Sequence, residues 1–255
     1  MQNNTFSTLF VGQNLIRLSA VDSTNNFLKM MVSNSGPVPE GTVIMADHQY
    51  AGRGQQGNTW HSEPGLNLTC SIVLYPEFLD VSNQYLLNMA VCVAVRDAAN
   101  SVLEEGVVIK WPNDIYHSDK KLGGILIENA ISGKKYKSAI IGIGLNVNQE
   151  YFSEDQVKAA ISFREILGRE LKVDDLLKII CHHLEVQYMR LRDSADELTD
   201  DYHNGLYRLG TPALFEESGR IFEATIKGVS KSGRLMLQTT KGVKEYGLKE
   251  VVFLT

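Results

Sequence analysis

The chain has 255 residues, of which 44% are hydrophobic, 22% charged and 8% aromatic. These proportions are typical of globular proteins, so they exclude a disordered chain and a fibrous repeat. The formal net charge of −5 argues against a dedicated nucleic-acid-binding protein, because such proteins usually carry a basic excess.

The N-terminal segment shows no secretion signal, because it lacks a basic stretch followed by an apolar core. The most apolar run, 86–95, is about half the length that a membrane-spanning helix requires. Cys70, Cys92 and Cys181 lie far apart and form no CxxC pair, so we expect buried thiols without a disulfide framework or a zinc site. These features predict a cytoplasmic protein that does not cross a membrane.

The first predicted element is a short helix capped by Asp22 or Ser23, ahead of a group of apolar residues. Three segments follow before residue 75: strands over 42–46 and 67–74, and between them a polar, glycine-rich loop over 47–65. The next element is a helix over 82–102. It is apolar almost all round, so we expect it to pack on the face of a sheet.

Strands predicted over 107–110, 124–128 and 137–143 follow one another too closely for helical crossovers, which favours antiparallel pairing. A helix over 173–191 then shows one apolar stripe at helical spacing. The last segments are short and strand-like, with glycine turns between them: 222–226, 235–238 and 251–254. Short strands with glycine turns are typical of a small β-barrel.

Together these elements predict an α+β protein with two domains. Residues 1–208 form a mixed, antiparallel-rich sheet with helices on one face, and residues 209–255 form a small β-barrel. A chain of this length buries a sufficient core without disulfides or structural metals.

The glycine-rich loop contains GRGQQG at residues 52–57, which matches the GxGxxG pattern of dinucleotide sites and resembles a P-loop. Both sites require a helix directly after the loop, but Pro64 and Gly65 break any helix here, and Asn58 stands where a P-loop has lysine. A plain surface loop is a further alternative. We favour a loop whose exposed backbone N–H groups and Arg53 bind a phosphate or carboxylate and close over a reactive intermediate.

Three later segments carry compatible chemistry: KWPND at 110–114, KLGG at 121–124 and GIGLNVN at 142–148. Glycines in or beside a strand let a ligand approach the backbone closely, and the lysines supply positive charge. Read singly, each segment is also explained by a tight turn or a solvated surface. The chain contains no HExxH zinc motif and no GxSxG nucleophile elbow.

Taken in order, four segments resemble the biotin protein ligase family: GRGQQGNTW (52–60), KWPND (110–114), KLGGILIE (121–128) and GIGLNVN (142–148). The early DSTN segment at 22–25 and Gln49 fit the same pattern. The likeness runs from about residue 15 to the C-terminus. It implies a sheet like that of class II synthetases, followed by an SH3-like C-terminal barrel.

The resemblance implies a ligase that activates biotin with ATP and Mg²⁺ to biotinyl-5′-AMP. Biotin then passes to a lysine of a biotin carboxyl carrier protein, typically that of acetyl-CoA carboxylase or a related carboxylase. Alternatives are a lipoate- or octanoate-type protein ligase and a non-catalytic biotin sensor. The family includes monomers and homodimers, and it implies no fixed metal site on the protein.

The resemblance also implies residue roles. The biotin site comprises Ser23, Thr24, Gln49, Gly52, Arg53, Lys121, Gly124 and Gly142. The ATP and adenylate site comprises Arg53, Gln55, Trp60, Asn113, Lys121, Gly144, Asn146 and Lys231. Arg53 and Lys121 are the implied catalytic cations, with Lys121 at the carboxyl–phosphate junction, and Asp114 orients or deprotonates the incoming lysine.

Two departures from the family pattern carry expectations of their own. The family loop usually has arginine where Gln55 stands, so we expect weaker retention of biotinyl-AMP. Some family members begin with a helix-turn-helix domain and act as repressors, but Ser23 stands too early in this chain for such a domain to precede it. The sequence therefore predicts a monofunctional ligase that binds no nucleic acid.

Overall fold

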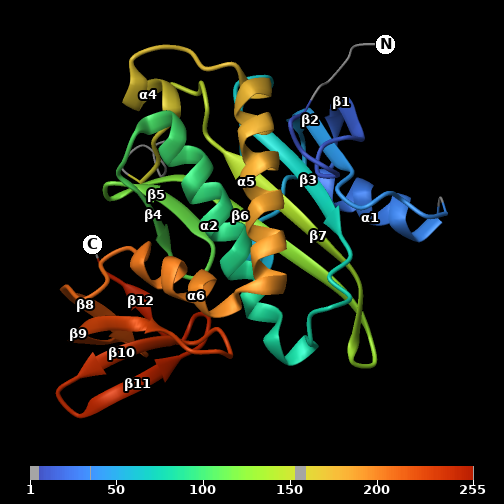
Figure 1. Cartoon of the computed structure of the whole chain (residues 1–255). Coiled ribbons are helices and arrows are strands. Elements are labelled where there is room, and N and C mark those ends of the chain that lie inside the picture. Colours follow the sequence, from blue (N-terminus) through green and yellow to red (C-terminus); the bar gives the residue numbers. More distant parts are fainter. Residues whose placement is uncertain (1–5, 35, 153–158, 255) are drawn as a thin grey trace.

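The computed structural model describes residues 6–34, 36–152 and 159–254. Residues 1–5 of the segment assessed for a secretion signal lie outside this part of the chain. A seven-stranded sheet with helices packed on it makes up most of the molecule, and a five-stranded sheet lies beside it (Figure 1). The predicted α+β class, with an antiparallel-rich sheet and a small C-terminal β unit, is confirmed.

The large sheet has the strand order β1-β2-β3-β7-β6-β5-β4. Its strands are β1 (Leu15–Val21), β2 (Val43–Gln49), β3 (Leu68–Leu74), β4 (Val107–Lys110), β5 (Asp114–His117), β6 (Lys120–Ser132) and β7 (Lys135–Leu145). The pair β1–β2 is parallel, because helix α1 (Thr24–Asn34) provides the crossover between the two strands. All other neighbouring pairs are antiparallel.

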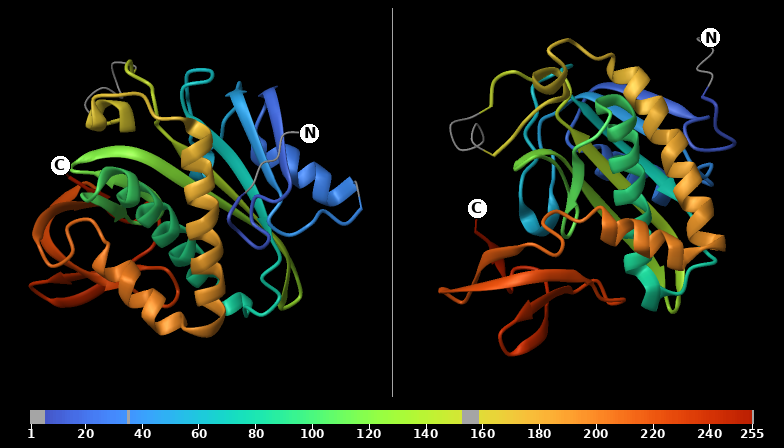
Figure 2. Two further views of the ribbon diagram at one scale, coloured as in Figure 1. Left: turned by 45° about the horizontal axis from the view of Figure 1, so that its top comes forward. Right: turned by 60° about the vertical axis from the view of Figure 1, so that its left-hand side comes forward.

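One face of this sheet is covered by α2 (Gln84–Leu103), α5 (Val173–Asp193) and α6 (Ala195–Asn204), while the short α4 (Phe163–Leu167) lies near the end of α2 (Figures 1 and 2). The main hydrophobic core lies under these helices. Helix α2 contributes most to it, with ten buried residues.

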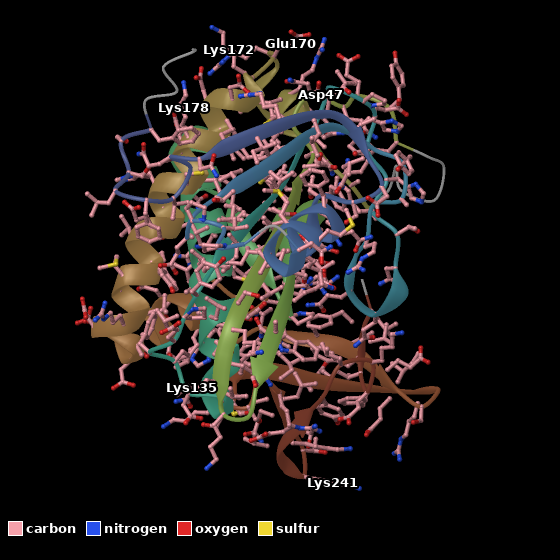
Figure 3. The ribbon with its side chains drawn as sticks, turned by 90° about the vertical axis from the view of Figure 1, so that its right-hand side faces the viewer. Asp47, Lys135, Glu170, Lys172, Lys178 and Lys241 are labelled. Carbon is pink, nitrogen blue, oxygen red and sulfur yellow. The ribbon has the colours of Figure 1, made fainter. Side chains whose placement is uncertain are left out.

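Helix α1 lies on the opposite face of the sheet. The prediction that the helices lie on one face is therefore wrong for α1. Its Leu28 packs with Ile44, Val73 and Ile140 in a second, smaller core. Side chains alternate between faces along a strand, and the neighbours of these three strand residues belong to the main core. The central strands are apolar on both faces and therefore need cover on both sides. Figure 3 views the molecule with α1 in front of the strands.

The segment Val81–Leu103 is long and apolar enough to span a membrane by length and composition alone. This segment comprises the short turn η2 (Val81–Asn83) and α2. It is longer than the apolar run 86–95 that was considered in the sequence. In its most apolar window, 61% of residues are buried inside the protein. Its contacts with α5, α6 and the sheet are those of a core helix.

The small sheet has the order β11-β10-β9-β8-β12, and every neighbouring pair is antiparallel. Its strands are β8 (Pro212–Glu217), β9 (Arg220–Val229), β10 (Leu235–Thr239), β11 (Gly242–Tyr246) and β12 (Val252–Phe253). The small sheet contacts the rest of the molecule at the end of β9 and in the turn after it. The Val229 N–H of β9 donates to His203 Nε2 of α6 at 3.1 Å, and the Trp111 indole N–H donates to the Gly233 carbonyl of the turn at 3.0 Å.

The three cysteines are free and buried, as predicted. Burial raises the pKa of the Cys70 thiol to about 12. The lysines around the β6–β7 turn are exposed, as expected of a solvated surface. Lys135 marks this turn at the lower end of Figure 3.

Candidate active site

A cavity of about 480 Å³ opens on the face of the large sheet that also carries α1. Three glycines clear the space: Gly124 pairs with Gly144 between β6 and β7, and Gly142 pairs with Leu126. They follow Ile140 at alternate positions in β7 and its partner strand, so they point to the same face. Helix α1 covers the sheet only up to these glycines, and because glycine has no side chain, room is left beside the helix for a ligand.

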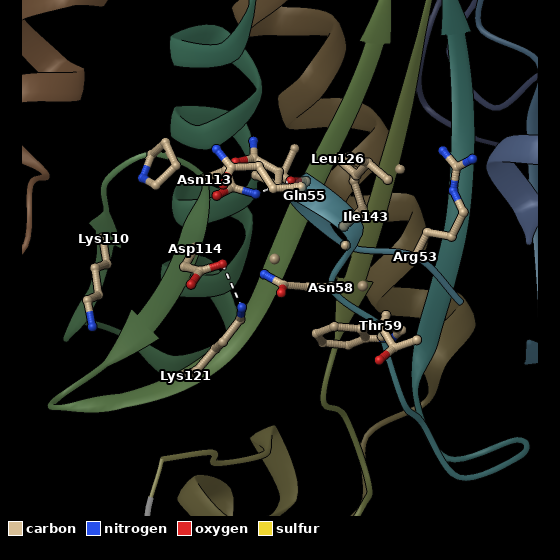
Figure 4. Close-up of a pocket in the computed structure, with 18 of the residues that line it drawn as sticks. Arg53, Gln55, Asn58, Thr59, Lys110, Asn113, Asp114, Lys121, Leu126 and Ile143 are labelled. Atoms are coloured by element: carbon tan, nitrogen blue, oxygen red, sulfur yellow. Dashed lines mark hydrogen bonds and ion pairs between the residues drawn. The ribbon is translucent and has the colours of Figure 1, made fainter. Parts of the chain in front are cut away.

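Most of the residues implied by the sequence resemblance line this cavity. They are Ser23, Thr24, Gln49, Arg53, Gln55, Trp60, Asn113, Asp114, Lys121, Gly124, Gly142 and Gly144. They come from α1, β2, the glycine loop, β5, β6 and β7, so residues up to 121 positions apart in sequence meet at one place (Figure 4).

Gly52, Asn146 and Lys231 lie outside the cavity lining. A Cβ atom on Gly52 would lie 2.4 Å from the Trp60 carbonyl oxygen, so glycine is needed there for close packing. The amide of Asn146 donates to the Ile161 carbonyl at 3.2 Å and supports the backbone beside Lys121. Lys231 is exposed in the turn between β9 and β10. The small sheet instead presents Lys249 to the cavity.

Lys121 and Asp114 form an ion pair within the cavity, with Nζ and Oδ1 2.7 Å apart (Figure 4). Asp114 starts β5 and pairs in register with Gly124 of β6. A Cβ atom at Gly124 would lie 3.3 Å from Asp114 Oδ1, so the glycine leaves room for this carboxylate. The pair brings a cation and a proton acceptor to one point of the cavity wall.

The backbone of Lys121 is fixed on both sides. Its N–H donates to the Ala159 carbonyl at 2.7 Å, and its carbonyl accepts from the Ile161 N–H at 3.0 Å. Further along the same strand, β6 is held by Asn113, whose side-chain amide donates to the Ile125 carbonyl while its backbone carbonyl accepts from the Ile125 N–H. Both reactive side chains therefore project from rigid strands rather than from a loop.

Lys110 is a further cation on the cavity wall, and the sequence analysis assigned it no role. It pairs in register with Asp114, and its Nζ donates to the Tyr116 hydroxyl at 3.1 Å. The Nζ also lies 4.6 Å from the Tyr116 ring centroid and 5.3 Å from that of Phe253 in β12. Burial lowers the pKa of Lys110, although the nearby Asp114 opposes the shift.

The glycine loop folds into a small hairpin. Arg53 and Thr59 form an antiparallel bridge, the Gly54 N–H donates to the Asn58 carbonyl at 2.7 Å, and the turn η1 (Gln55–Gly57) forms its tip. The next regular element is β3, not a helix. The dinucleotide and P-loop interpretations both required a helix there, so the structure excludes them.

Trp60 lies directly over Gly144. A Cβ atom at Gly144 would lie 2.6 Å from Cε2 of the indole, so any other residue would displace the ring. The indole Nε1 is buried and has no hydrogen-bond partner among the described residues. It is a donor available to a molecule that enters the cavity.

The other end of the cavity is polar. Gln49 Oε1 accepts from the Thr24 N–H at 2.8 Å, and Ser71 Oγ lies 2.7 Å from Thr24 Oγ1 and 2.5 Å from Asn25 Oδ1. A Cβ atom at Gly142 would lie 2.5 Å from the same Asn25 oxygen. The donors and acceptors named at this end belong to neutral side chains, which suits a neutral polar head group.

Within the described ranges, no three His, Cys, Asp or Glu side chains come together in a way that could hold a metal ion. Several lining residues had no local sequence signal. Asn25 lay in the DSTN segment and was given no role, and five lining residues come from β12 and the turn before it: Leu248, Lys249, Val251, Val252 and Phe253. Only the packing of the two sheets brings the latter to the cavity.

Residues 18–146 match the model of the biotin/lipoate A/B protein ligase family. Over 191 residues the chain is 36% identical to the bifunctional ligase/repressor BirA of Bacillus subtilis, covering 73% of this chain and 56% of that protein. It is 27% identical to the biotin–[acetyl-CoA-carboxylase] ligase of Mycobacterium tuberculosis, covering 72% and 68% of the two chains. The chain thus spans about half the length of the BirA relatives that it matches.

The whole structure is similar to that of the biotin protein ligase from Aquifex aeolicus in complex with biotin and ATP. The TM-score is 0.79 at 28% identity, and the match covers 95% of this chain and 99% of that one. A Leishmania major biotin protein ligase in complex with biotinyl-5-AMP matches with a TM-score of 0.61 at 25% identity, over 92% and 99% of the two chains.

Proposed function

Because this chain belongs to the biotin/lipoate A/B protein ligase family, we propose that it activates biotin with ATP and transfers the biotinyl group to a protein lysine. The observation that carries the proposal is the Lys121–Asp114 pair on the wall of a glycine-cleared cavity. The similar ligase from Aquifex aeolicus was solved with biotin and ATP, the two molecules that such a reaction brings together.

In the first step, the carboxylate of biotin attacks the α-phosphate of ATP, which enters with its Mg²⁺, and pyrophosphate leaves. Two anions must meet, so the protein has to supply cations and backbone donors that hold them together. Lys121 supplies the charge at the carboxyl–phosphate junction, and Arg53 and the hairpin backbone N–H groups bind the anions from the other side. The polar end around Thr24 and Gln49 binds the neutral ureido group.

In the second step, an amine of the carrier attacks the acyl carbon of biotinyl-5′-AMP, an amide bond forms and AMP leaves. The attacking lysine must first lose a proton. Asp114 Oδ1 lies 2.7 Å from Lys121 Nζ, so Asp114 can accept that proton or orient the amine at the same junction. Trp60 offers to the adenine side a flat ring and an N–H that has no partner in the described part of the chain.

The carrier we propose is the biotin carboxyl carrier protein of acetyl-CoA carboxylase or of a related carboxylase, and the place of the reaction is the cytoplasm. The M. tuberculosis relative is named for the acetyl-CoA carboxylase reaction. The family also contains lipoate ligases, so lipoate is the competing acid substrate.

The transfer is tested with the purified protein, Mg²⁺, ATP, biotin and a biotin carboxyl carrier domain, with streptavidin detection of the product. We expect labelling of the carrier's target lysine and none of a carrier in which that lysine is replaced by arginine. Equal labelling of both carriers, or none with either, would contradict the proposed transfer.

A further inference from the structure

Arg53 reaches the cavity, but its guanidinium group points away from Lys121 and Asp114 (Figure 4). It forms an ion pair with Glu128 of β6, through Nη2 and Oε1, and its Nη1 donates to Asn26 Oδ1 at 2.9 Å. The charged edge that would bind a substrate anion is therefore occupied by a carboxylate of the protein itself.

Glu128 has two further partners. Lys29 Nζ donates to Oε1 at 2.8 Å, and the Asn25 amide donates to Oε2 at 2.9 Å. Partial burial opposes ionisation of Glu128, but the hydrogen bonds from Lys29, Asn25 and Arg53 together lower its pKa. Glu128 is thus a carboxylate at neutral pH, and it keeps one cation and one donor if Arg53 leaves.

These contacts describe an exchange between two anions. A guanidinium group binds carboxylates and phosphates through the same fork of N–H donors, so a substrate anion and Glu128 compete for Arg53. A partly buried carboxylate left without a cation would resist the exchange. Lys29 lowers this cost, because its ion pair with Glu128 Oε1 remains when Arg53 turns to a substrate anion.

We propose that Glu128 and Lys29 are positioning residues that control the availability of Arg53 to the anionic substrates. Glu128 holds Arg53 while no anion is bound, and Lys29 weakens that hold by sharing the carboxylate. The role of Arg53 rests on the proposed function. Neither Glu128 nor Lys29 lines the cavity.

The proposal predicts opposite effects for two neighbouring substitutions. Glu128→Gln removes the competing charge and should lower the dissociation constants of biotin and ATP about two- to fivefold, the range of a partly exposed ion pair. Among the described residues, Lys29→Met leaves Arg53 as the one cation on Glu128, so it should raise both dissociation constants by a similar factor. The double variant should behave like Glu128→Gln, because Lys29 acts only through that carboxylate.

Isothermal titration calorimetry of the full chain measures these constants, with biotinol and adenosine as the matched uncharged ligands. The dissociation constants of these uncharged ligands should not change, because they do not compete with Glu128 for the guanidinium group of Arg53. Equal shifts for charged and uncharged ligands, or shifts of the same sign in both single variants, would overturn the proposal. Lys29 is exposed, so we expect Lys29→Met to fold. If Glu128→Gln does not fold, the direction in which Lys29→Met changes the dissociation constants still tests the proposal. A wild-type chain that binds neither biotin nor ATP would instead overturn the proposed function, on which the role of Arg53 depends.

Discussion

Lys121 shows how much of a functional residue can be seen in a sequence and how much depends on its surroundings. The motif at 121–128 identifies the lysine and the glycines after it. The segment at 159–161 that holds its backbone, and the 2.7 Å contact with Asp114, arise only in the folded protein. The KWPND segment, read singly, was also explained by a tight turn, but its Asp114 begins a strand that brings it opposite Gly124.

Replacing Lys121 by alanine should impair biotin activation far more than folding. Loss of a cation at the developing charge should cost more than ~2 kcal/mol in the transition state, or a rate loss above about 30-fold. Pyrophosphate release under single-turnover conditions measures this loss. The matched control is Lys120→Ala, which removes a partly exposed lysine paired with Glu165 and should keep the wild-type rate. An unchanged rate for Lys121→Ala would remove this residue from the mechanism.

Gln55 lies in the hairpin tip that lines the cavity, at the place where the family usually has arginine. A Gln55→Arg variant adds a bidentate cation there and should slow the release of biotinyl-5′-AMP several-fold. The release rate is measured by chasing pre-formed, labelled adenylate with unlabelled biotin and ATP. Gln55→Lys adds the charge without the guanidinium fork and should retain the adenylate less well. Release from Gln55→Arg as fast as from wild type would contradict the idea that Gln55 weakens retention.

At the scale of elements, the sequence pattern located the apolar segments well. The strand predicted over 107–110 matches β4, and the helices predicted over 82–102 and 173–191 match α2 and α5 within two residues at each end. β5 was missed because it has four residues, of which Ile115 alone is aliphatic, and it follows β4 directly in a hairpin. The sheet face on which α1 packs was also not predictable. Its single buried leucine, Leu28, gives no strong periodic signal, and the face that a helix covers depends on the whole sheet.

Helix α5 anchors the N-terminal segment through one carboxylate, which provides a test at this scale. Glu185 is buried and accepts the backbone N–H groups of Leu9, Phe10 and Val11 at 2.7, 2.8 and 3.1 Å. Glu185→Ala leaves these donors unpaired, so the free energy of unfolding should fall by about 2–3 kcal/mol. Chemical denaturation measures the change, and Val186→Ala on the exposed side of the helix is the control. A loss below about 0.5 kcal/mol for Glu185→Ala would show that the anchor contributes little.

For the whole molecule, the two sheets meet at the cavity. Phe253 of β12 packs against Lys110, and Lys249 reaches the cavity lining from the far part of the chain. The sequence analysis assigned Lys249 no role, because its contact with the cavity depends on how the two sheets pack. The assignment of Lys231 to the nucleotide stays a prediction. The division into domains at 208/209 stays a prediction. In the structure, the chain passes from α6 to β8 close to this position.

Trp111 tests the contact between the sheets, because its indole N–H donates to Gly233 beyond β9. Trp111→Phe keeps a buried aromatic ring but loses the hydrogen bond, which should cost about 1 kcal/mol and lower the melting temperature by about 2–4 °C. Trp60→Phe is the matched control, since the Trp60 N–H has no partner among the described residues and its loss should not affect stability. Equal melting temperatures for Trp111→Phe and wild type would mean that this bond does not hold the sheets together.

The central claim is that this cavity activates biotin with ATP. The most direct measurement is pyrophosphate release by the purified chain with Mg²⁺ and ATP, comparing biotin with lipoate and octanoate. We expect release with biotin alone, and its loss in Lys121→Ala. Release with lipoate or octanoate instead of biotin would contradict the claim and assign the protein to the lipoate branch of its family, and no release with any of the three acids would contradict acid activation altogether.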